Sequence, residues 1–279
     1  MPNDFNASVI AEFRASNGRV GGMFEGARLL LLTTTGARSG NRHTVPLGYL
    51  PDGERVLVIG SNGGSRRHPA WYHNLLAKPV ATVEDGVFVY EAAAVMLAGR
   101  ERDDAFARAV EQDAGWAGYE RQSGRVLPVV ALEALPMSGP PRSGAGSPGE
   151  MLRLVHDAFR RELSLIRAEV AGSGAVLGAQ LRVNCLSLCA GLHGHHVRED
   201  QGMFPGLEYA YPQLAPVIER LRAEHVAVAA LVERLRSVVS DPAVERGALI
   251  AEVGVLAGEL EKHLEYEERE LIPALDGML

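Results

Sequence analysis

The pattern of hydrophobic and polar positions changes class part-way along the chain. Between residues 27 and 135 the apolar residues come in short runs, separated by Gly, Pro, Asn and Asp. Such runs are typical of β-strands. After residue 150 the apolar residues recur with the 3.6-residue period of helices, over four long stretches. The pattern therefore predicts two domains of different class.

The first domain is predicted to be an α+β sheet or a small barrel. A helix is expected over residues 5–24, where apolar residues recur at roughly helical spacing. The expected strands are residues 29–35, 45–50, 55–60, 81–84, 87–95 and 126–132, and a second helix is expected over 101–112. Turn residues at 51–54 and at 85–86 predict two hairpins. Antiparallel strands with few helices argue against a doubly wound fold.

The second domain is predicted to be a helical bundle behind a linker. Residues 137–149 contain four Gly, three Pro and three Ser, a composition too polar and broken to pack. We therefore expect a first domain over 1–136, a linker over 137–149 and a second domain over 150–279. The expected helices are residues 152–166, 177–202, 214–239 and 249–272, and four long helices indicate a bundle.

Charge and composition exclude some function classes. The net charge of −7 over 279 residues argues against nucleic acid or an anionic membrane as the main partner. No apolar run approaches the roughly 18 residues that a membrane span needs. The first residues lack both the basic and the apolar part of a secretion signal. Cys185 and Cys189 lie four apart in an apolar stretch and are expected to be buried thiols, which favours a cytoplasmic protein.

Two short stretches of the second domain carry the spacing of a metal site. His195 and Glu199 lie four residues apart, as do His263 and Glu267. On a helix this spacing puts an imidazole and a carboxylate on one face, where both can reach the same point. A Pro follows six residues after each Glu and is expected to help end the helix.

The two halves of the second domain also repeat one another. Leu152-Arg153-x-x-His156 returns as Leu221-Arg222-x-x-His225, and a His-x3-Glu pair follows each His after a similar interval. A single periodic His is more simply a satisfied core or surface residue. Six residues matched in identity and register favour a two-metal centre instead. Its predicted ligands are His156, His195, Glu199, His225, His263 and Glu267.

With these motifs, residues 150–279 resemble the hemerythrin-like cation-binding (HHE) family. The resemblance implies an all-α, four-helix up-down bundle around a non-haem, oxo-bridged di-iron centre. The four His would be terminal ligands, and Glu199 and Glu267 bridging carboxylates; iron or manganese suits this set, and zinc stays an alternative. Ala229 replaces the second His that oxygen-carrying hemerythrins have on the third helix. The set is closer to that of the iron–sulfur-cluster-repair di-iron proteins, which favours O2, NO or peroxide chemistry over oxygen transport.

Polar neighbours of the predicted ligands are expected to matter less. His193 and His196 lie off the inferred ligand face and are expected to be solvated or to sit beside the ligands. Asp200 and Glu268 each follow a bridging Glu directly, about 100° round the helix, and are expected on a solvated face. Tyr266 is interpreted either as an inward hydrogen-bond donor or as a packing residue.

Three stretches of the first domain carry candidate binding residues. Residues 33–43 follow a strand and offer amides, hydroxyls and two Arg, which suits a phosphate or an acidic tail. A hairpin turn with surface Arg explains those residues alone more simply. Residues 61–65 also follow a strand and contain two Gly, which let a ligand approach the backbone. Residues 66–75 open a helix with Pro and aromatic residues.

Taken in this order, the three stretches resemble the deazaflavin-dependent nitroreductase family, also described as deazaflavin (F-420) quinone or nitro reductases. The likeness runs from about Ala27 to Leu135 and implies a split β-barrel, FMN-binding-like, that binds reduced coenzyme F-420 and passes a hydride to an acceptor. Arg38 and Arg42 would hold the phosphate and glutamate tail of the coenzyme. The other residues that the resemblance assigns to the coenzyme are Ser61, Asn62, Gly63, Gly64, Trp71 and Asn74.

The resemblance also assigns catalytic residues at the acceptor site. Tyr119 would border the acceptor, with Trp116 where relatives often carry Tyr. Asn62 replaces a basic residue found in some members. Both departures leave the acceptor, a quinone or a nitro compound, open.

The leading hypothesis is a bifunctional oxidoreductase. Reduced deazaflavin would supply electrons that the di-iron centre uses on O2, NO or an O2-dependent organic substrate. One alternative is a nitro or quinone reductase with a regulatory or oxygen- or iron-sensing bundle. Another is a di-iron enzyme whose first domain is a scaffold without coenzyme. The expected partners are a small molecule or a diatomic gas, and a homo-oligomer is compatible with the sequence.

Overall fold

The computed structural model describes residues 4–136, 142–174, 177–241 and 243–277. The chain divides into two compact units, Met1–Gly144 with Gly178–Gln180, and Ala145–Leu177 with Leu181–Leu279. The first is rich in strands and the second is helical, so the predicted change of class is confirmed. In the described part of the chain, no helix is both long and apolar enough to cross a membrane.

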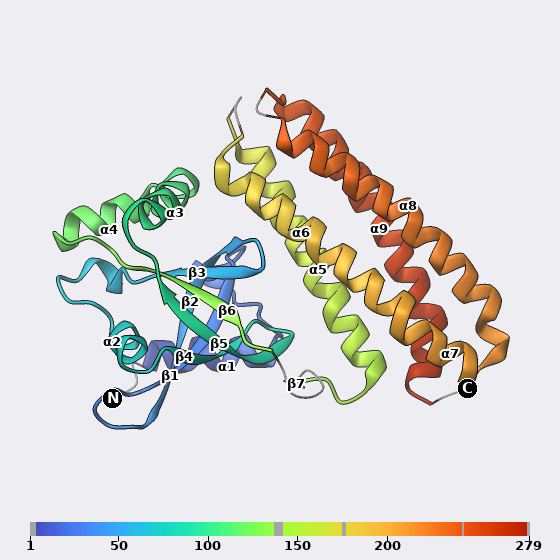
Figure 1. Cartoon of the computed structure of the whole chain (residues 1–279), viewed down its shortest axis with the longest axis horizontal. Coiled ribbons are helices and arrows are strands. Elements are labelled where there is room, and N and C mark those ends of the chain that lie inside the picture. The colour runs from blue at the N-terminus through green and yellow to red at the C-terminus, as the bar shows by residue number, and fades with distance from the viewer. Residues whose placement is uncertain (1–3, 137–141, 175–176, 242, 278–279) are drawn as a thin grey trace. The chain divides into compact units, whose positions relative to one another are not determined.

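The strands of the first unit form a closed antiparallel barrel (Figure 1). Its six strands are β1 (Leu29–Thr35), β2 (Arg42–Asp52), β3 (Arg55–Ile59), β4 (Val80–Glu84), β5 (Phe88–Met96) and β6 (Val129–Ala134). They are hydrogen-bonded in the order β4-β1-β2-β3-β6-β5, and pairing of β4 with β5 closes the barrel. The two predicted hairpins are β2–β3 and β4–β5. The structure thus confirms the small barrel among the alternatives.

Strand β1 is apolar throughout because both of its faces are covered. Leu30 and Leu32 belong to a core cluster that joins five strands with α2 (Ala70–Ala77). Leu29 and Leu31, on the opposite face, pack with Val9 and other residues that include those of α1 (Asp4–Ala15). A strand buried on both faces loses the alternation of a half-exposed strand. Helices α3 (Gly99–Gln112) and α4 (Gly115–Ser123) complete the unit.

Two predicted boundaries of the first unit are wrong. The first helix ends at Ala15 rather than at residue 24, because Asn17 and Gly18 take positive φ values of 51° and 89°. The last strand begins at Val129 rather than at residue 126. Pro128 has no N–H to give to a strand ladder, and its carbonyl accepts a hydrogen bond from the amide of Gly60.

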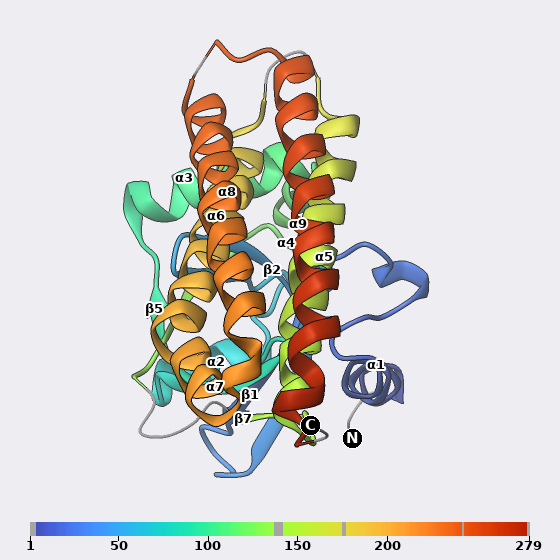
Figure 2. The ribbon, with the colours of Figure 1, turned by 90° about the vertical axis from the view of Figure 1, so that its right-hand side faces the viewer.

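The second unit is a four-helix bundle, as predicted. Figure 2 shows its long helices side by side. They are α5 (Pro148–Gly172), α6 (Ala179–Arg198), α8 (Ala215–Ser240) and α9 (Arg246–Leu275), with α7 (Phe204–Ala210) a short addition. Ile166, Leu192, Leu235 and Leu256, one from each long helix, are fully buried in a common core. Cys185 and Cys189 lie in the same core as free thiols.

Part of the expected linker is structured. Residues 137–141 lie outside the described residues. Arg142–Ser143 form a short strand, β7, that pairs with β5. Helix α5 then begins at Pro148, and the hydroxyl of Ser147 accepts a hydrogen bond from the amide of Glu150. Ser followed by Pro is typical of the start of a helix. The Gly, Pro and Ser content that indicated a linker therefore includes a helix start.

The helix that carries Glu199 does not end at Pro205 as expected. Residues Glu199–Met203 form a π-helical turn, in which the amide of Phe204 donates to the carbonyl of Glu199. Helix α7 then continues to Ala210. Pro205 lies in the first turn of α7, where a missing N–H costs nothing. The second proline, Pro273, lies inside the last turn of α9, which ends two residues later.

Candidate metal centre and coenzyme pocket

Five imidazoles and two carboxylates present unpartnered atoms to the interior of the bundle. These buried atoms have no hydrogen-bond partner: Nε2 of His156, His195, His196, His225 and His263, and both carboxylate oxygens of Glu199 and Glu267. Most buried polar atoms in proteins have a hydrogen-bond partner, so a cluster of nine without one requires an explanation. All of them are of types that ligate metal ions.

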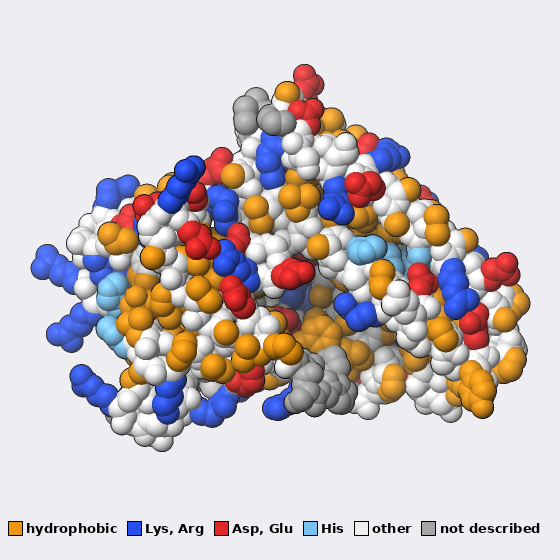
Figure 3. Space-filling model, in the orientation of Figure 1, with side chains coloured by type: hydrophobic (Ala, Val, Ile, Leu, Met, Phe, Trp, Pro, Cys, Tyr) orange, Lys and Arg blue, Asp and Glu red, His pale blue; other side chains and the backbone are white. Residues whose placement is uncertain are grey.

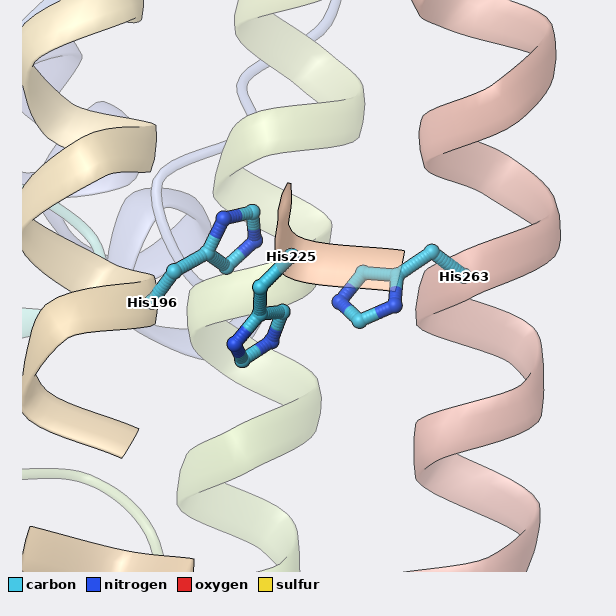
Figure 4. Close-up of side chains that lie close together, drawn as sticks. All are labelled: His196, His225 and His263. Atoms are coloured by element: carbon cyan, nitrogen blue, oxygen red, sulfur yellow. The ribbon is translucent and has the colours of Figure 1, made fainter. Parts of the chain in front are cut away.

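The seven side chains form two groups. His156, His195, Glu199 and Glu267 bring ligand atoms within 4.8 Å of one another, and so do His196, His225 and His263. Figure 4 shows the second group, whose three rings lie close together and come from different helices. The structure therefore brings all six predicted ligands together and adds His196 to them.

Both glutamates belong to the first group and also approach the second. Glu199 Oε1 is 3.1 Å from His195 Nε2, and Glu199 Oε2 is 3.6 Å from His225 Nε2. Oε2 of Glu267 is 3.4 Å from His156 Nε2 and 3.7 Å from His263 Nε2. Two atoms that bind one ion at about 2.1 Å and at right angles lie about 3 Å apart. Each carboxylate thus approaches one histidine of each group.

Electrostatics of the centre favour a cation. Burial, and then the carboxylate of Glu267, raise the pKa of Glu199. Burial and the neighbouring imidazoles lower the pKa of both His195 and His196 to about 2, so these rings are neutral. The buried carboxylate of Glu199, beside these neutral rings, is costly to keep ionised. A bound cation would balance its charge.

Three carboxylates hold the imidazoles from outside. Nδ1–H of His156 donates to Glu268 Oε1 at 2.8 Å. In the same way His225 donates to Asp200 Oδ1 at 3.0 Å, and His263 donates to Glu224 Oε2 at 3.0 Å. Such bonds fix the tautomer and leave Nε2 free for a metal.

The expectation that Asp200 and Glu268 lie on a solvated face holds only in part. Their side chains are 37% and 20% exposed, and each also accepts a hydrogen bond from an imidazole of a neighbouring helix. Glu224 was not singled out by sequence, although it directly precedes a predicted ligand.

The other neighbours divide between correct and wrong expectations. His193 is exposed, as expected. Tyr266 packs beneath Arg220, whose guanidinium carbon is 3.7 Å from the ring centroid, so packing and a cation–π contact account for it. His196 is only 6% exposed, and its ring lies 4.2 Å from that of His225, so of its two expected placements it takes the one beside the ligands.

The barrel has a pocket of about 1330 Å³ beside α1, α2 and the β1–β2 loop. It is lined by four predicted coenzyme residues, Arg38, Arg42, Trp71 and Asn74. Asn74 donates to Thr34 Oγ1 at 3.0 Å and accepts from the amide of Ala37 at 3.0 Å, so it ties α2 to the loop. Arg42 donates to Thr82 Oγ1 at 2.6 Å. Two guanidinium groups beside aromatic and amide side chains suit an anionic ligand that carries a ring.

The remaining predicted coenzyme residues lie elsewhere in the barrel. Ser61, Asn62, Gly63 and Gly64 are not among the residues that line the 1330 Å³ pocket. The last three form a 3-10 turn against α4, in which all three have positive φ. Gly64 has a φ of 77°, which other residues rarely adopt, and a Cβ there would lie 2.6 Å from the amide end of Gln122.

The two predicted catalytic residues are neighbours on α4. The rings of Trp116 and Tyr119 are 6.1 Å apart, centroid to centroid. Trp116 packs against the core cluster around Phe106, and Tyr119 is exposed. Neither lines the 1330 Å³ pocket.

Arg125 is a residue that sequence reasoning missed. Its guanidinium group donates to the carbonyls of Gly60, Ser61 and Ser65 at 2.9–3.0 Å and lies 2.9 Å from His68 Nδ1. One side chain thus holds the whole loop after β3. Nothing in the sequence near Arg125 signals this role, because its partners lie about 60 residues away.

Comparisons with known proteins agree with both halves of the chain. Residues 7–134 match the model of the family "F420H(2)-dependent quinone reductase", and residues 147–275 match "Hemerythrin HHE cation binding domain". An F420H(2)-dependent quinone reductase of Mycobacterium tuberculosis strain H37Rv is 36% identical over 126 residues, 44% of this chain and 85% of that protein. Its counterpart in strain CDC 1551 matches with the same figures.

A solved structure of an F420-H2 dependent reductase is 36% identical, with a TM-score of 0.36 over 38% of this chain and 94% of that one. The chain therefore belongs to the F420H(2)-dependent quinone reductase family through residues 7–134, fused to a hemerythrin HHE domain in residues 147–275.

Proposed function

We propose that this chain is an oxidoreductase with two cooperating sites. The barrel binds reduced coenzyme F-420, and the bundle holds two iron ions that act on O2, NO or an O2-dependent organic substrate. The observation that carries the proposal is the cluster of nine buried imidazole and carboxylate atoms without a hydrogen-bond partner. A core histidine without a ligand would find a protein partner for Nε2.

The donor set fits a pair of iron ions. Glu199 and Glu267 would bridge them, and His156, His195, His225 and His263 would be terminal ligands. Imidazole with carboxylate suits iron or manganese, and zinc is the competing ion. When bound, the ions supply redox and Lewis-acid chemistry. Glu268, Asp200 and Glu224 keep the rings oriented.

The barrel pocket fits the anionic end of a deazaflavin. Arg38 and Arg42 would pair with its phosphate and carboxylates, and Trp71 would contact its rings. By likeness to the mycobacterial relatives, the hydride acceptor is a quinone.

Charges on the face shown in Figure 3 are interspersed rather than gathered into one basic patch. The reduced cysteine pair fits a cytoplasmic setting.

Electron transfer between the sites is the testable core of the proposal. A hydride needs its acceptor in contact, so electrons pass to the metal singly or through a reduced quinone. Anaerobic mixing of reduced coenzyme with oxidised, iron-loaded protein should bleach the near-ultraviolet absorption of the oxidised iron. Glu199→Ala, which removes a bridging ligand, is the control that should show no such signal. An absorption that stays unchanged with coenzyme bound overturns direct coupling.

A regulatory bundle is the second candidate. Every residue that lines the barrel pocket lies within the first unit, so coenzyme binding does not need the bundle's residues. This hypothesis predicts that His156→Ala strips the metal and leaves quinone reduction by F-420 intact. A third hypothesis makes the barrel a scaffold that binds no coenzyme. It predicts that coenzyme titration of the metal-loaded protein shows no binding, while metal-dependent activity persists.

A further inference from the structure

The strongest unassigned feature is His196, a buried imidazole beside the six ligands proposed above. It directly follows His195 on α6, so its side chain points about 100° away around that helix. Its Nε2 is nevertheless buried and has no hydrogen-bond partner. Like the Nε2 atoms of the proposed ligands, this atom is buried and lacks a hydrogen-bond partner.

The ring of His196 lies close to the rings of two of those ligands. Its centroid is 4.2 Å from that of His225 and 5.2 Å from that of His263, which are themselves 4.9 Å apart (Figure 4). Imidazoles that share one ion through bonds of about 2.1 Å have centroids about 4.5 to 5.2 Å apart. Both separations from His263 fall in this range, and the separation of His196 from His225 is slightly shorter. His156 and His195, the proposed pair on the other ion, are separated by 5.2 Å.

We propose that His196 is a metal ligand, which makes the two ions of the centre inequivalent. One ion would have His156 and His195, and the other would have His196, His225 and His263, with Glu199 and Glu267 between them. This inference rests on the proposed di-iron function and deepens it. Three imidazoles on one ion and two on the other give the ions different affinities and different spectra.

A stacked core residue is the competing interpretation. The rings of His196 and His225 are nearly parallel, at 12°, and Phe204 stacks on His225 at 16°. Coordination by both histidines requires one ring to turn about its Cβ–Cγ bond, a torsion with a broad preference. Stacking alone leaves the buried Nε2 unexplained, because an apolar ring would pack there without losing hydration.

His196→Phe separates the two interpretations, because phenylalanine keeps a ring to stack and removes the donor atom. His193→Phe, an exposed position three residues earlier on α6, is the matched control. Iron(II) is titrated anaerobically into the metal-free full chain against a chelator of known affinity. We expect His196→Phe to lower the affinity for one of the two ions by at least about 10-fold. Even the loss of a residue that only hydrogen-bonds a ligand costs that much affinity. His193→Phe should leave both ions unchanged.

Two further measurements keep the result interpretable. Mössbauer spectra of 57Fe-loaded wild type should resolve two iron environments, and His196→Phe should alter one of them. Thermal unfolding of the metal-free proteins shows whether the variant folds, and the rise in Tm on adding iron(II) should shrink in His196→Phe alone. A folded His196→Phe that binds both ions with wild-type affinity and spectrum overturns the assignment of His196. A wild-type chain that binds no pair of ions overturns the proposed function instead.

Discussion

At the scale of single residues, three histidines of the bundle donate hydrogen bonds to carboxylates, two of which the sequence placed on a solvated face. Glu268 is the clearest case, because it lies between His156 and Arg160, which donates to it at 2.8 Å. Burial works against its ionised form, but these two hydrogen bonds outweigh burial and lower the pKa of Glu268. It therefore stays charged and holds His156 with Nε2 directed inward.

Glu268→Gln should weaken metal binding without removing a ligand. The amide cannot hold the ring as a carboxylate does, and loss of such a partner typically costs about 10- to 100-fold in affinity. Chelator competition with iron(II) measures the change. Glu265→Gln, at an exposed position of the same helix, is the control. Equal affinities in the two variants would show that Glu268 does not orient His156.

Arg125→Ala should loosen the loop after β3. Three carbonyls lose a charged donor, and we expect a loss of about 2 to 3 kcal/mol in the free energy of unfolding. Urea denaturation of the full chain gives this quantity, and coenzyme titration should show weaker binding with the metal content unchanged. Arg121→Ala, at an exposed position on α4, should change neither. Wild-type stability in Arg125→Ala would contradict the role of this side chain.

At the scale of elements, the π-helical turn after Glu199 sets the register of α7. π-turns inside helices occur frequently at functional sites. Here the extra residue lets Glu199 face the centre while Phe204 and Leu207, further along, face the core. Phe204 also stacks on the ring of His225, with centroids 5.3 Å apart.

Deletion of Gly202 should destabilise the bundle. Removing one residue restores α-helical geometry and rotates α7 by about 100°, which takes Phe204 out of the core. Loss of a buried Phe costs about 3 to 5 kcal/mol, measurable by urea unfolding followed by circular dichroism. Gly202→Ala keeps the turn, and its Cβ would meet no atom within 4 Å. This variant should raise the free energy of unfolding by up to about 1 kcal/mol. A deletion as stable as Gly202→Ala would show that the turn does not set the register.

At the scale of the whole molecule, two units with separate cores carry separate ligand sites. The barrel pocket is lined by residues of the first unit, and the proposed metal ligands all lie in the second. A ligand that binds only the folded state stabilises the unit that binds it. Metal and coenzyme should therefore act on different unfolding transitions.

Calorimetry of the full chain should show two transitions that respond independently. Removal of metal by a chelator should lower the Tm of one transition, and added coenzyme should raise the Tm of the other. At about 100 times Kd the stabilisation is about 2.7 kcal/mol, several degrees in Tm for units of this size. His156→Ala identifies the metal-linked transition. A single transition moved by both ligands would show that the units unfold together.

Local pattern was sufficient for the class of both domains and for bringing the six proposed metal ligands into one hypothesis. Helical period and the His-x3-Glu spacing are local properties, and the internal repeat compares two local patterns. Tertiary structure decided the rest. Whether His196, Asp200 and Glu268 face solvent or a neighbour depends on which helix packs beside α6 and α9. Barrel closure by β4 and β5, and the loop contacts of Arg125, likewise join residues whose proximity no short window of sequence encodes.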